Sequence, residues 1–169
     1  YLELSKKILE HKKPYLDFAF EYPPFSLIPI SFPYWITQSS NELKLMTYRL
    51  LFMLFMFCFD ILIFKKIKEN AKKYVLFYIA LSSMMLTFSF ERLDLFMLLP
   101  FVYAVWSFDQ GESNKAIIWS TIGGWIKLIP FVSYLGLLKS GTGKIINILK
   151  MAFSNIIAMF VFYLFFGFS

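Results

Sequence analysis

Long apolar stretches with almost no charges alternate with short polar segments along the chain. The runs 74–90, 95–108 and 151–169 contain no charged residue. Each is close to the roughly 17–25 residues that a helix needs to cross a hydrocarbon core of about 30 Å. Strands of a membrane barrel alternate polar and apolar residues with a period of two, and these runs do not. The pattern predicts an all-α fold: a polytopic helical membrane protein with about five to six transmembrane helices.

A cluster of lysines between two apolar runs sets the expected orientation. The segment 65–73 contains five lysines and a single acid, and an excess of lysine and arginine is typical of cytoplasmic loops. The segment 48–64 is then expected to run from outside to inside, and 74–90 returns outside. The run 95–108 goes back in, and the polar stretch 109–115 forms a second internal loop.

The next stretch, 116–138, allows two interpretations. It is either one span of 23 residues or a tight hairpin of two short helices. Gly123-Gly124 and Pro130 favour the hairpin, because proline interrupts the hydrogen bonds of a helix. The hairpin also returns the lysines of 139–150 to the cytoplasmic side, and 151–168 then crosses outward.

The first 47 residues are expected to lie outside, as an external amphipathic and re-entrant region. Apolar and charged residues alternate over 2–11 as in an amphipathic helix on the membrane surface. The apolar segment 23–35 carries four prolines and is predicted to be interfacial or re-entrant. We therefore expect one partial membrane domain over 1–169, with transmembrane helices over 48–169. Because the chain starts at Tyr1, an upstream transmembrane helix is also expected.

Composition narrows the classes of function. The chain is 59% hydrophobic and 21% aromatic, with a mean hydropathy of +0.62 and a net charge of +6. The clustering of the lysines argues against a nucleic-acid partner. Cys58 and His11 are each the only residue of their type, so neither a disulfide nor a cysteine metal site is available.

Charged residues in three motifs are expected to meet at the external side. Asp17 and Glu21 belong to the first 47 residues, Arg92 and Asp94 to the turn 91–94, and Lys127 to the hairpin. Helices starting near 95 and 130 would both point their N-termini outward, and a helix N-terminus attracts anions. With Arg92 and Lys127 beside these ends, the pattern is typical of a site for a lipid phosphate.

Each of these motifs also has a purely structural interpretation. Arg92 and Asp94 would also suit a solvated turn with a charge pair, and Lys127 would also suit a side chain that reaches the interface without a ligand. Asp17 and Glu21 are ordinary residues for an external loop.

Two charged residues of the segment 48–64 complete the candidates. Arg49 is equally well interpreted as a third anion contact or as an interface anchor. Asp60 is expected to pair with the lysines of 65–73 and to be structural.

Four motifs together resemble the GT-C membrane glycosyltransferases, most closely the polyprenyl-phosphate-mannose-type enzymes. Pro14-Tyr-Leu-Asp-Phe18 followed by Phe20-Glu-Tyr-Pro-Pro24, and then Tyr48-Arg-Leu, look like the first external loop and second helix of that family. Glu91-Arg-Leu-Asp94 is similar to its Arg-x-Asp element, and Gly123-Gly-Trp-Ile-Lys-Leu-Ile-Pro130 to its Gly-x-x-x-Lys-x-x-Pro element. In order and spacing the resemblance covers nearly the whole chain.

The resemblance implies a hexosyltransferase that inverts the anomeric carbon at the external face of the cell membrane. The donor would be a sugar on polyprenyl phosphate, and the acceptor a hydroxyl of a lipid, glycan or protein. The expected pocket acids are Asp17, Glu21 and Asp94. The expected substrate-binding residues are Arg92, Lys127, Tyr22 and Arg49, of which Arg92 and Lys127 match the phosphate side.

One element of the family pattern falls outside this sequence. The family's usual catalytic aspartate is expected a few residues before the position of Tyr1, so the chain is expected to be an incomplete catalyst. Some GT-C enzymes use a divalent cation, for which the three pocket acids would supply oxygen ligands; no other cofactor is expected. The alternatives are a transporter or flippase component and a non-catalytic membrane subunit that binds an anionic lipid.

Overall fold

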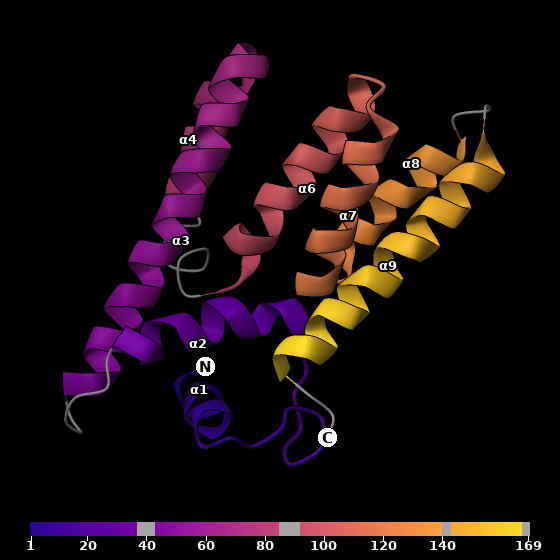
Figure 1. The fold of residues 1–169 in the computed structure, drawn as a ribbon. Coiled ribbons are helices and arrows are strands. Elements are labelled where there is room, and N and C mark those ends of the chain that lie inside the picture. Colours follow the sequence, from indigo (N-terminus) through magenta and orange to yellow (C-terminus); the bar gives the residue numbers. More distant parts are fainter. Residues whose placement is uncertain (37–42, 85–91, 140–142, 167–169) are drawn as a thin grey trace. The chain divides into compact units, whose positions relative to one another are not determined.

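The protein is all-helical, as predicted (Figure 1). A computed structural model describes residues 1–36, 43–84, 92–139 and 143–166. Helices make up 83% of the structure, and these ranges contain no strand. The chain divides into two compact units. Unit 1 consists of Tyr1–His11 and Leu27–Leu99, and unit 2 consists of Lys12–Ser26 and Pro100–Ser169.

Unit 1 is built from helices in the first half of the chain. They are α1 (Leu2–Leu9), α2 (Leu27–Ile36), α3 (Leu43–Asn70), the 3-10 turn η2 (Lys72–Tyr74), α4 (Val75–Met84) and the first residues of α6 (Asp94–Asp109). The predicted helix over 2–11 is confirmed by α1. The segment 23–35, predicted to be interfacial or re-entrant, contains a 3-10 turn and most of α2, which includes Pro33.

A buried hydrogen-bond cluster joins the first three helices of unit 1. The Ser5 hydroxyl of α1 donates to the carbonyl of Ile30 at 2.6 Å and to the Tyr48 hydroxyl at 3.3 Å. The Tyr48 hydroxyl of α3 donates to the same carbonyl at 2.9 Å. Ser5 is 0% exposed and Tyr48 is 4% exposed. Buried hydroxyls are costly unless they are paired, so this cluster specifies how α1, α2 and α3 pack.

The lysines of unit 1 are placed differently from the prediction. Instead of forming a loop over 65–73, the chain stays helical to Asn70, and only Ala71 separates α3 from η2. Lysine and glutamate are good helix formers, so charge alone does not end α3. The predicted span 74–90 begins as α4, and its residues 85–90 lie outside the described ranges.

Asp60 has different partners from those predicted. Its carboxylate accepts hydrogen bonds from the Tyr78 hydroxyl and, at 3.1 Å, from the Ser82 hydroxyl, both on α4. Tyr78 and Ser82 are four residues apart, so they lie on the same face of α4. The expected pairing with the lysines of 65–73 is therefore wrong, because the facing helix supplies nearer donors.

Unit 2 contains the remaining helices. They are the 3-10 turn η1 (Pro24–Ser26), the rest of α6, α7 (Ser113–Ile126), the 3-10 turn η3 (Ile129–Val132), α8 (Ser133–Lys139) and α9 (Lys144–Phe166). The predicted loop over 109–115 is present in shortened form, between Asp109 and Ser113.

The predicted hairpin over 116–138 is confirmed. Helix α7 ends at Ile126, where Lys127 adopts an extended conformation. Contacts then pair residues in reverse order along the two arms: Gly123 with Pro130, Thr121 with Tyr134, and Ala116 with Leu137 in one core cluster. The chain therefore turns back on itself between α7 and α8 and does not form one continuous span.

Helix α9 is the longest element of unit 2. Its first residues include Lys144 and Lys150, which were predicted to precede the helix. The segment Lys144–Leu164 has a mean hydropathy of 1.9 and is the one described helix that is long and apolar enough to cross a membrane. The shorter helical segment Ile129–Leu138 is also apolar. The prediction of five to six transmembrane helices stays a prediction.

Candidate substrate-binding site

A cavity of about 610 Å³ lies within unit 2. The loop before η1, the turn between α7 and α8, and α9 form its walls. We call it the aromatic cavity, because aromatic rings supply much of its lining. The lining residues are Tyr15, Phe20, Glu21, Tyr22, Pro23, Pro24, Gly124, Trp125, Leu128, Phe131, Asn155, Met159 and Phe162. Cavities of about 300–1,000 Å³ with apolar walls and a few polar groups are typical of small-molecule sites.

The loop over 12–26 is folded by its own hydrogen bonds. Tyr15 has a positive φ of 70°, its N–H donates to the Phe18 carbonyl at 3.1 Å, and its hydroxyl donates to the Tyr22 carbonyl. Burial raises the pKa of the Tyr15 phenol to about 12, so this group stays protonated and remains a donor at physiological pH. The loop thereby presents Glu21 and Tyr22 at the cavity.

The two acids of this loop have different positions. Glu21 is exposed and lines the aromatic cavity. Asp17 accepts the backbone N–H of Lys13 at 2.6 Å and is not among the cavity residues. An aspartate that bonds to a nearby backbone N–H stabilises a tight turn. Asp17 thus has a local role in holding the loop, whereas Glu21 places a carboxylate at the cavity.

Two glycines make the hairpin wall possible. A Cβ atom on Gly124 would lie 2.3 Å from the Phe131 ring, and one on Gly123 would lie 2.8 Å from Pro130. Both distances are shorter than real carbon contacts, so side chains are excluded at these positions. The close approach of the two arms brings Phe131 and Trp125 to the same cavity.

A polar network behind the cavity holds Trp125. Its indole N–H donates to the Asn155 side-chain oxygen at 2.8 Å, and the Asn155 amide donates to the Tyr134 hydroxyl at 3.2 Å and to the Met151 carbonyl at 2.8 Å. Thr121 bonds to Tyr134 and, at 2.8 Å, to Ser154. The network joins α7, α8 and α9 and fixes the indole ring at the cavity wall.

Sequence reasoning missed Trp125 and Asn155. Trp125 lies inside the Gly-x-x-x-Lys-x-x-Pro motif, but its role depends on a partner 30 residues away in the chain. Asn155 is a polar residue in an apolar run. An amide in such a run needs a hydrogen-bonding partner, so the sequence could have indicated Asn155 in this way.

Lys127 lies at the end of α7, next to the cavity residues Trp125 and Leu128 along the chain. It is half-buried, and its backbone N–H donates to the Gly123 carbonyl at 2.9 Å. It is not itself among the lining residues. Of the four predicted site residues in unit 2, Glu21 and Tyr22 line the aromatic cavity, whereas Asp17 and Lys127 do not.

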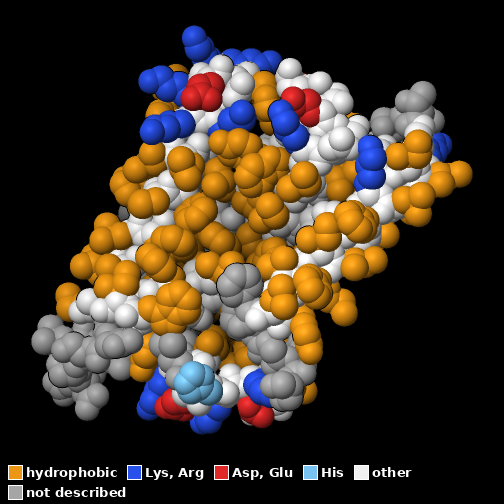
Figure 2. Space-filling model, viewed as in Figure 1, with side chains coloured by type: hydrophobic (Ala, Val, Ile, Leu, Met, Phe, Trp, Pro, Cys, Tyr) orange, Lys and Arg blue, Asp and Glu red, His pale blue; other side chains and the backbone are white. Residues whose placement is uncertain are grey.

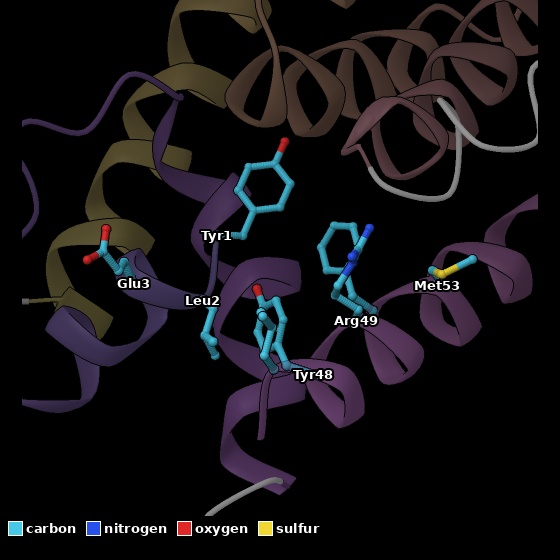
Figure 3. A pocket seen from close by; sticks show the side chains of 8 residues that line it. Tyr1, Leu2, Glu3, Tyr48, Arg49 and Met53 are labelled. Carbon is cyan, nitrogen blue, oxygen red and sulfur yellow. The ribbon is translucent and has the colours of Figure 1, made fainter. Parts of the chain in front are cut away.

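The other three predicted site residues belong to unit 1. Asp94 is the first residue of α6, and Arg92 precedes it and is exposed. A carboxylate in the first turn of a helix is stabilised by the helix dipole, so Asp94 has a structural reason to be there. Arg49 lies on α3 and lines a separate cavity of unit 1 (Figure 3). Glu91 lies outside the described residues.

Metal-binding residues do not cluster in the part of the chain that the structure describes. Within it, no group of three or more His, Cys, Asp or Glu side chains is arranged to hold a metal ion. The predicted acids Asp17, Glu21 and Asp94 are accordingly distributed over a turn, a cavity wall and a helix start.

No protein-family model, no curated protein and no solved structure matches the chain.

Proposed function

We propose that this chain is part of a polytopic membrane glycosyltransferase. In this proposal it transfers a sugar from a polyprenyl-phosphate donor to a hydroxyl of a lipid, glycan or protein, with inversion, at the external face of the cell membrane. The single observation that carries the proposal is the aromatic cavity, whose lining combines the carboxylate of Glu21 with the hydrogen-bonded pair of Trp125 and Asn155.

The surface of α9 supports membrane placement. Large hydrophobic side chains are exposed all along this helix, as Figure 2 shows. A long helix with a mostly apolar surface is either a buried core helix or a membrane span. Only 22% of the most apolar window of α9 is buried inside the protein, which argues against a core helix. Lipid is therefore the environment that we propose for it.

The helices of unit 1 support the same placement. Leu76, Phe77 and Met84 of α4 are largely exposed, as are Leu50, Leu54 and Phe57 of α3. Soluble monomers rarely expose contiguous apolar patches of more than a few hundred Å². Lysines are concentrated where α3 ends and η2 begins. We assign this end of α3 to the cytoplasmic side.

The chemistry of the aromatic cavity suits a sugar. The C–H face of a sugar ring packs against aromatic side chains, and its hydroxyls donate to carboxylates. Tyr22 and Trp125 supply rings, and the exposed Glu21 supplies an acceptor. A charge-assisted hydrogen bond from a sugar hydroxyl to Glu21 is stronger than one to a neutral group. We assign Glu21 to the binding and orientation of the sugar or the acceptor.

The phosphate of the donor requires a cation. Charge accumulates on the leaving phosphate in the transition state, and a positioned basic group stabilises it. Lys127 suits this role, because it follows the cavity residue Trp125 by two positions and is partly buried. Arg92 and Asp94 belong to unit 1 and do not line this cavity.

Proton transfer needs a further residue. A residue other than Asp17 acts as general base, because the Asp17 carboxylate holds a turn. In this scheme the base takes the acceptor proton as the oxygen attacks the anomeric carbon. Glu21 orients the reactants.

The test uses membranes from cells that express the complete reading frame containing this chain. A panel of polyprenyl-phosphate sugars is supplied with hydroxyl acceptors, and the anomeric configuration of the product is read by NMR. Loss of one charge-assisted hydrogen bond costs about 1.5–3 kcal/mol. Glu21→Gln keeps a neutral acceptor and loses about half of this, so we expect kcat/KM to fall by about tenfold or less.

The matched control is Glu112→Gln. Glu112 is an exposed acid of the same unit that pairs with Lys115 at 2.7 Å and is not a cavity residue. Its removal should leave transfer unchanged. Absence of sugar transfer by wild-type membranes across the panel would overturn the proposed function. Equal activity of Glu21→Gln and wild type would contradict a role for the aromatic cavity in the reaction.

A further inference from the structure

A second cavity, of about 490 Å³, lies wholly within unit 1 (Figure 3). Five of its lining residues form one stripe of α3: Leu45, Tyr48, Arg49, Phe52 and Met53. The spacing i, i+3, i+4, i+7, i+8 places them on one face of a helix. The opposite wall is the start of the chain, Tyr1–Glu3. None of these residues lines the aromatic cavity of unit 2.

The apolar part of this cavity is held in a fixed shape. The Tyr48 hydroxyl belongs to the buried cluster with Ser5 and Ile30. The Phe52 ring stacks on Tyr48 with centroids 6.2 Å apart and contacts Tyr1 at 5.3 Å. A wall whose side chains are locked in this way loses little conformational entropy when an apolar chain packs against it.

The charged groups of the cavity are arranged asymmetrically. Arg49 is exposed. Figure 3 shows its guanidinium group and the Tyr1 hydroxyl extending toward the same side, whereas the Glu3 carboxylate points away from Arg49. One side of the cavity therefore presents hydrogen-bond donors and a positive charge. A guanidinium group binds phosphate oxygens through two parallel N–H donors.

We propose that this cavity binds an anionic glycerophospholipid of the surrounding bilayer. Its phosphate would contact Arg49 and the Tyr1 hydroxyl, and an acyl chain would pack against Leu45 and Met53. The amphipathic helix α1 forms one wall, and such helices lie at the level of the lipid headgroups.

The bilayer lipid is favoured over the glycosyl donor because the proposed function assigns the sugar of the donor to the aromatic cavity. A donor must bring its sugar to the aromatic cavity, and the two cavities share no residue. The inference rests on the membrane placement in the proposed function and is independent of sugar transfer.

The experiment places the protein in nanodiscs of phosphatidylcholine with an equal share of phosphatidylglycerol. Native mass spectrometry after mild removal of the disc then counts the retained lipids. We expect wild type to retain phosphatidylglycerol in preference to phosphatidylcholine. The ratio of the two retained lipids should be about tenfold lower for Arg49→Gln. Arg49→Lys keeps the charge without the planar group, so we expect an intermediate result.

The matched control is Lys6→Gln, which removes one cation from α1. Lys6 pairs with Glu10 at 3.9 Å and does not line the cavity, so its removal should leave lipid retention unchanged. Circular dichroism of each variant in the discs verifies that the helices are intact. If Arg49→Gln unfolds, the comparison of Arg49→Lys with wild type decides the question.

Four outcomes would overturn the inference. The first is equal retention of phosphatidylglycerol by wild type and the Arg49 variants. The second is displacement of phosphatidylglycerol by an equimolar polyprenyl phosphate, which would make the cavity a donor site. The third is wild-type protein that does not enter the discs, which would also contradict the membrane placement. A protein that enters the discs without a lipid preference contradicts the inference alone.

Discussion

The two cavities use their polar residues in opposite ways. In unit 1 the buried hydroxyls of Ser5 and Tyr48 bond to one carbonyl and to each other, so they join helices and leave the cavity apolar apart from its charged rim. In unit 2 the hydrogen-bond network ends at the cavity wall, where Asn155 holds the indole N–H of Trp125. The first arrangement fixes the shape of a cavity, and the second fixes the indole ring of Trp125 at a cavity wall.

Because of this difference, substitutions in the two units should affect stability and activity differently. Substitutions in the cluster of unit 1 should change how firmly three helices pack, with little effect on the reaction proposed for unit 2. Substitutions in the network of unit 2 should change both, because the same bonds hold α7 to α9 and position Trp125.

Gly124→Ala should be the most damaging change. The new Cβ atom would meet the Phe131 ring at 2.3–2.5 Å, so the two arms of the hairpin must move apart and the aromatic cavity must change shape. Overpacking of this kind costs about 1–3 kcal/mol. We expect a lower midpoint of thermal unfolding in detergent and loss of sugar transfer.

Gly136→Ala is the control for this change. A Cβ atom there would meet the Phe108 ring at 3.5 Å, an ordinary contact. Alanine is preferred over glycine inside a helix by about 1 kcal/mol, so Gly136→Ala should leave stability unchanged or raise it. A Gly124→Ala protein as stable and active as Gly136→Ala would contradict the close approach of the two arms.

Asn155→Leu should have the next largest effect. It removes the acceptor of the Trp125 indole N–H and the donor to the Tyr134 hydroxyl. A buried donor left without a partner costs about 1–3 kcal/mol. We expect lower stability, measured by thermal unfolding, and a higher KM for the sugar donor, because the indole ring is no longer held at the cavity.

The comparison for this prediction is Asn147→Leu on the same helix. Asn147 is buried and Asn155 is partly buried. The Asn147 amide donates to the Leu137 carbonyl at a long 3.4 Å, and Asn147 does not line the aromatic cavity. Its replacement should cost less stability and leave KM unchanged. If both variants shift KM equally, the network positions no residue for the reaction.

Local patterns in the sequence predicted much of this fold. The amphipathic segment 2–11 and the break after Ile126 depend on neighbouring residues, so both were predictable. The start of α6 was also placed to within one residue, because Asp94 follows a charged turn and precedes an apolar run. Helix ends within charged segments were less predictable, since the lysines of 65–68 continue α3.

Long-range pairs were not predictable. Asp60 lies five residues before the lysines, yet it bonds to Tyr78 and Ser82 on the facing helix. Trp125 and Asn155 meet only because the hairpin packs against α9. Of the candidate site, the sequence indicated Glu21 and Tyr22 through their motif, whereas the residues that complete their cavity depend on tertiary packing.

The smallest predicted effect concerns the cluster of unit 1 and uses a double-mutant cycle. Ser5→Ala and Tyr48→Phe should each lower the free energy of unfolding by about 1 kcal/mol, the typical net value of one hydrogen bond. Both variants lose the bond between the two hydroxyls, so the double variant should cost less than the sum by about 0.5 kcal/mol or more. Sugar transfer should stay unchanged in all three. Additive losses would show that the two hydroxyls act separately, and reduced transfer at unchanged stability would show that unit 1 takes part in the sugar transfer.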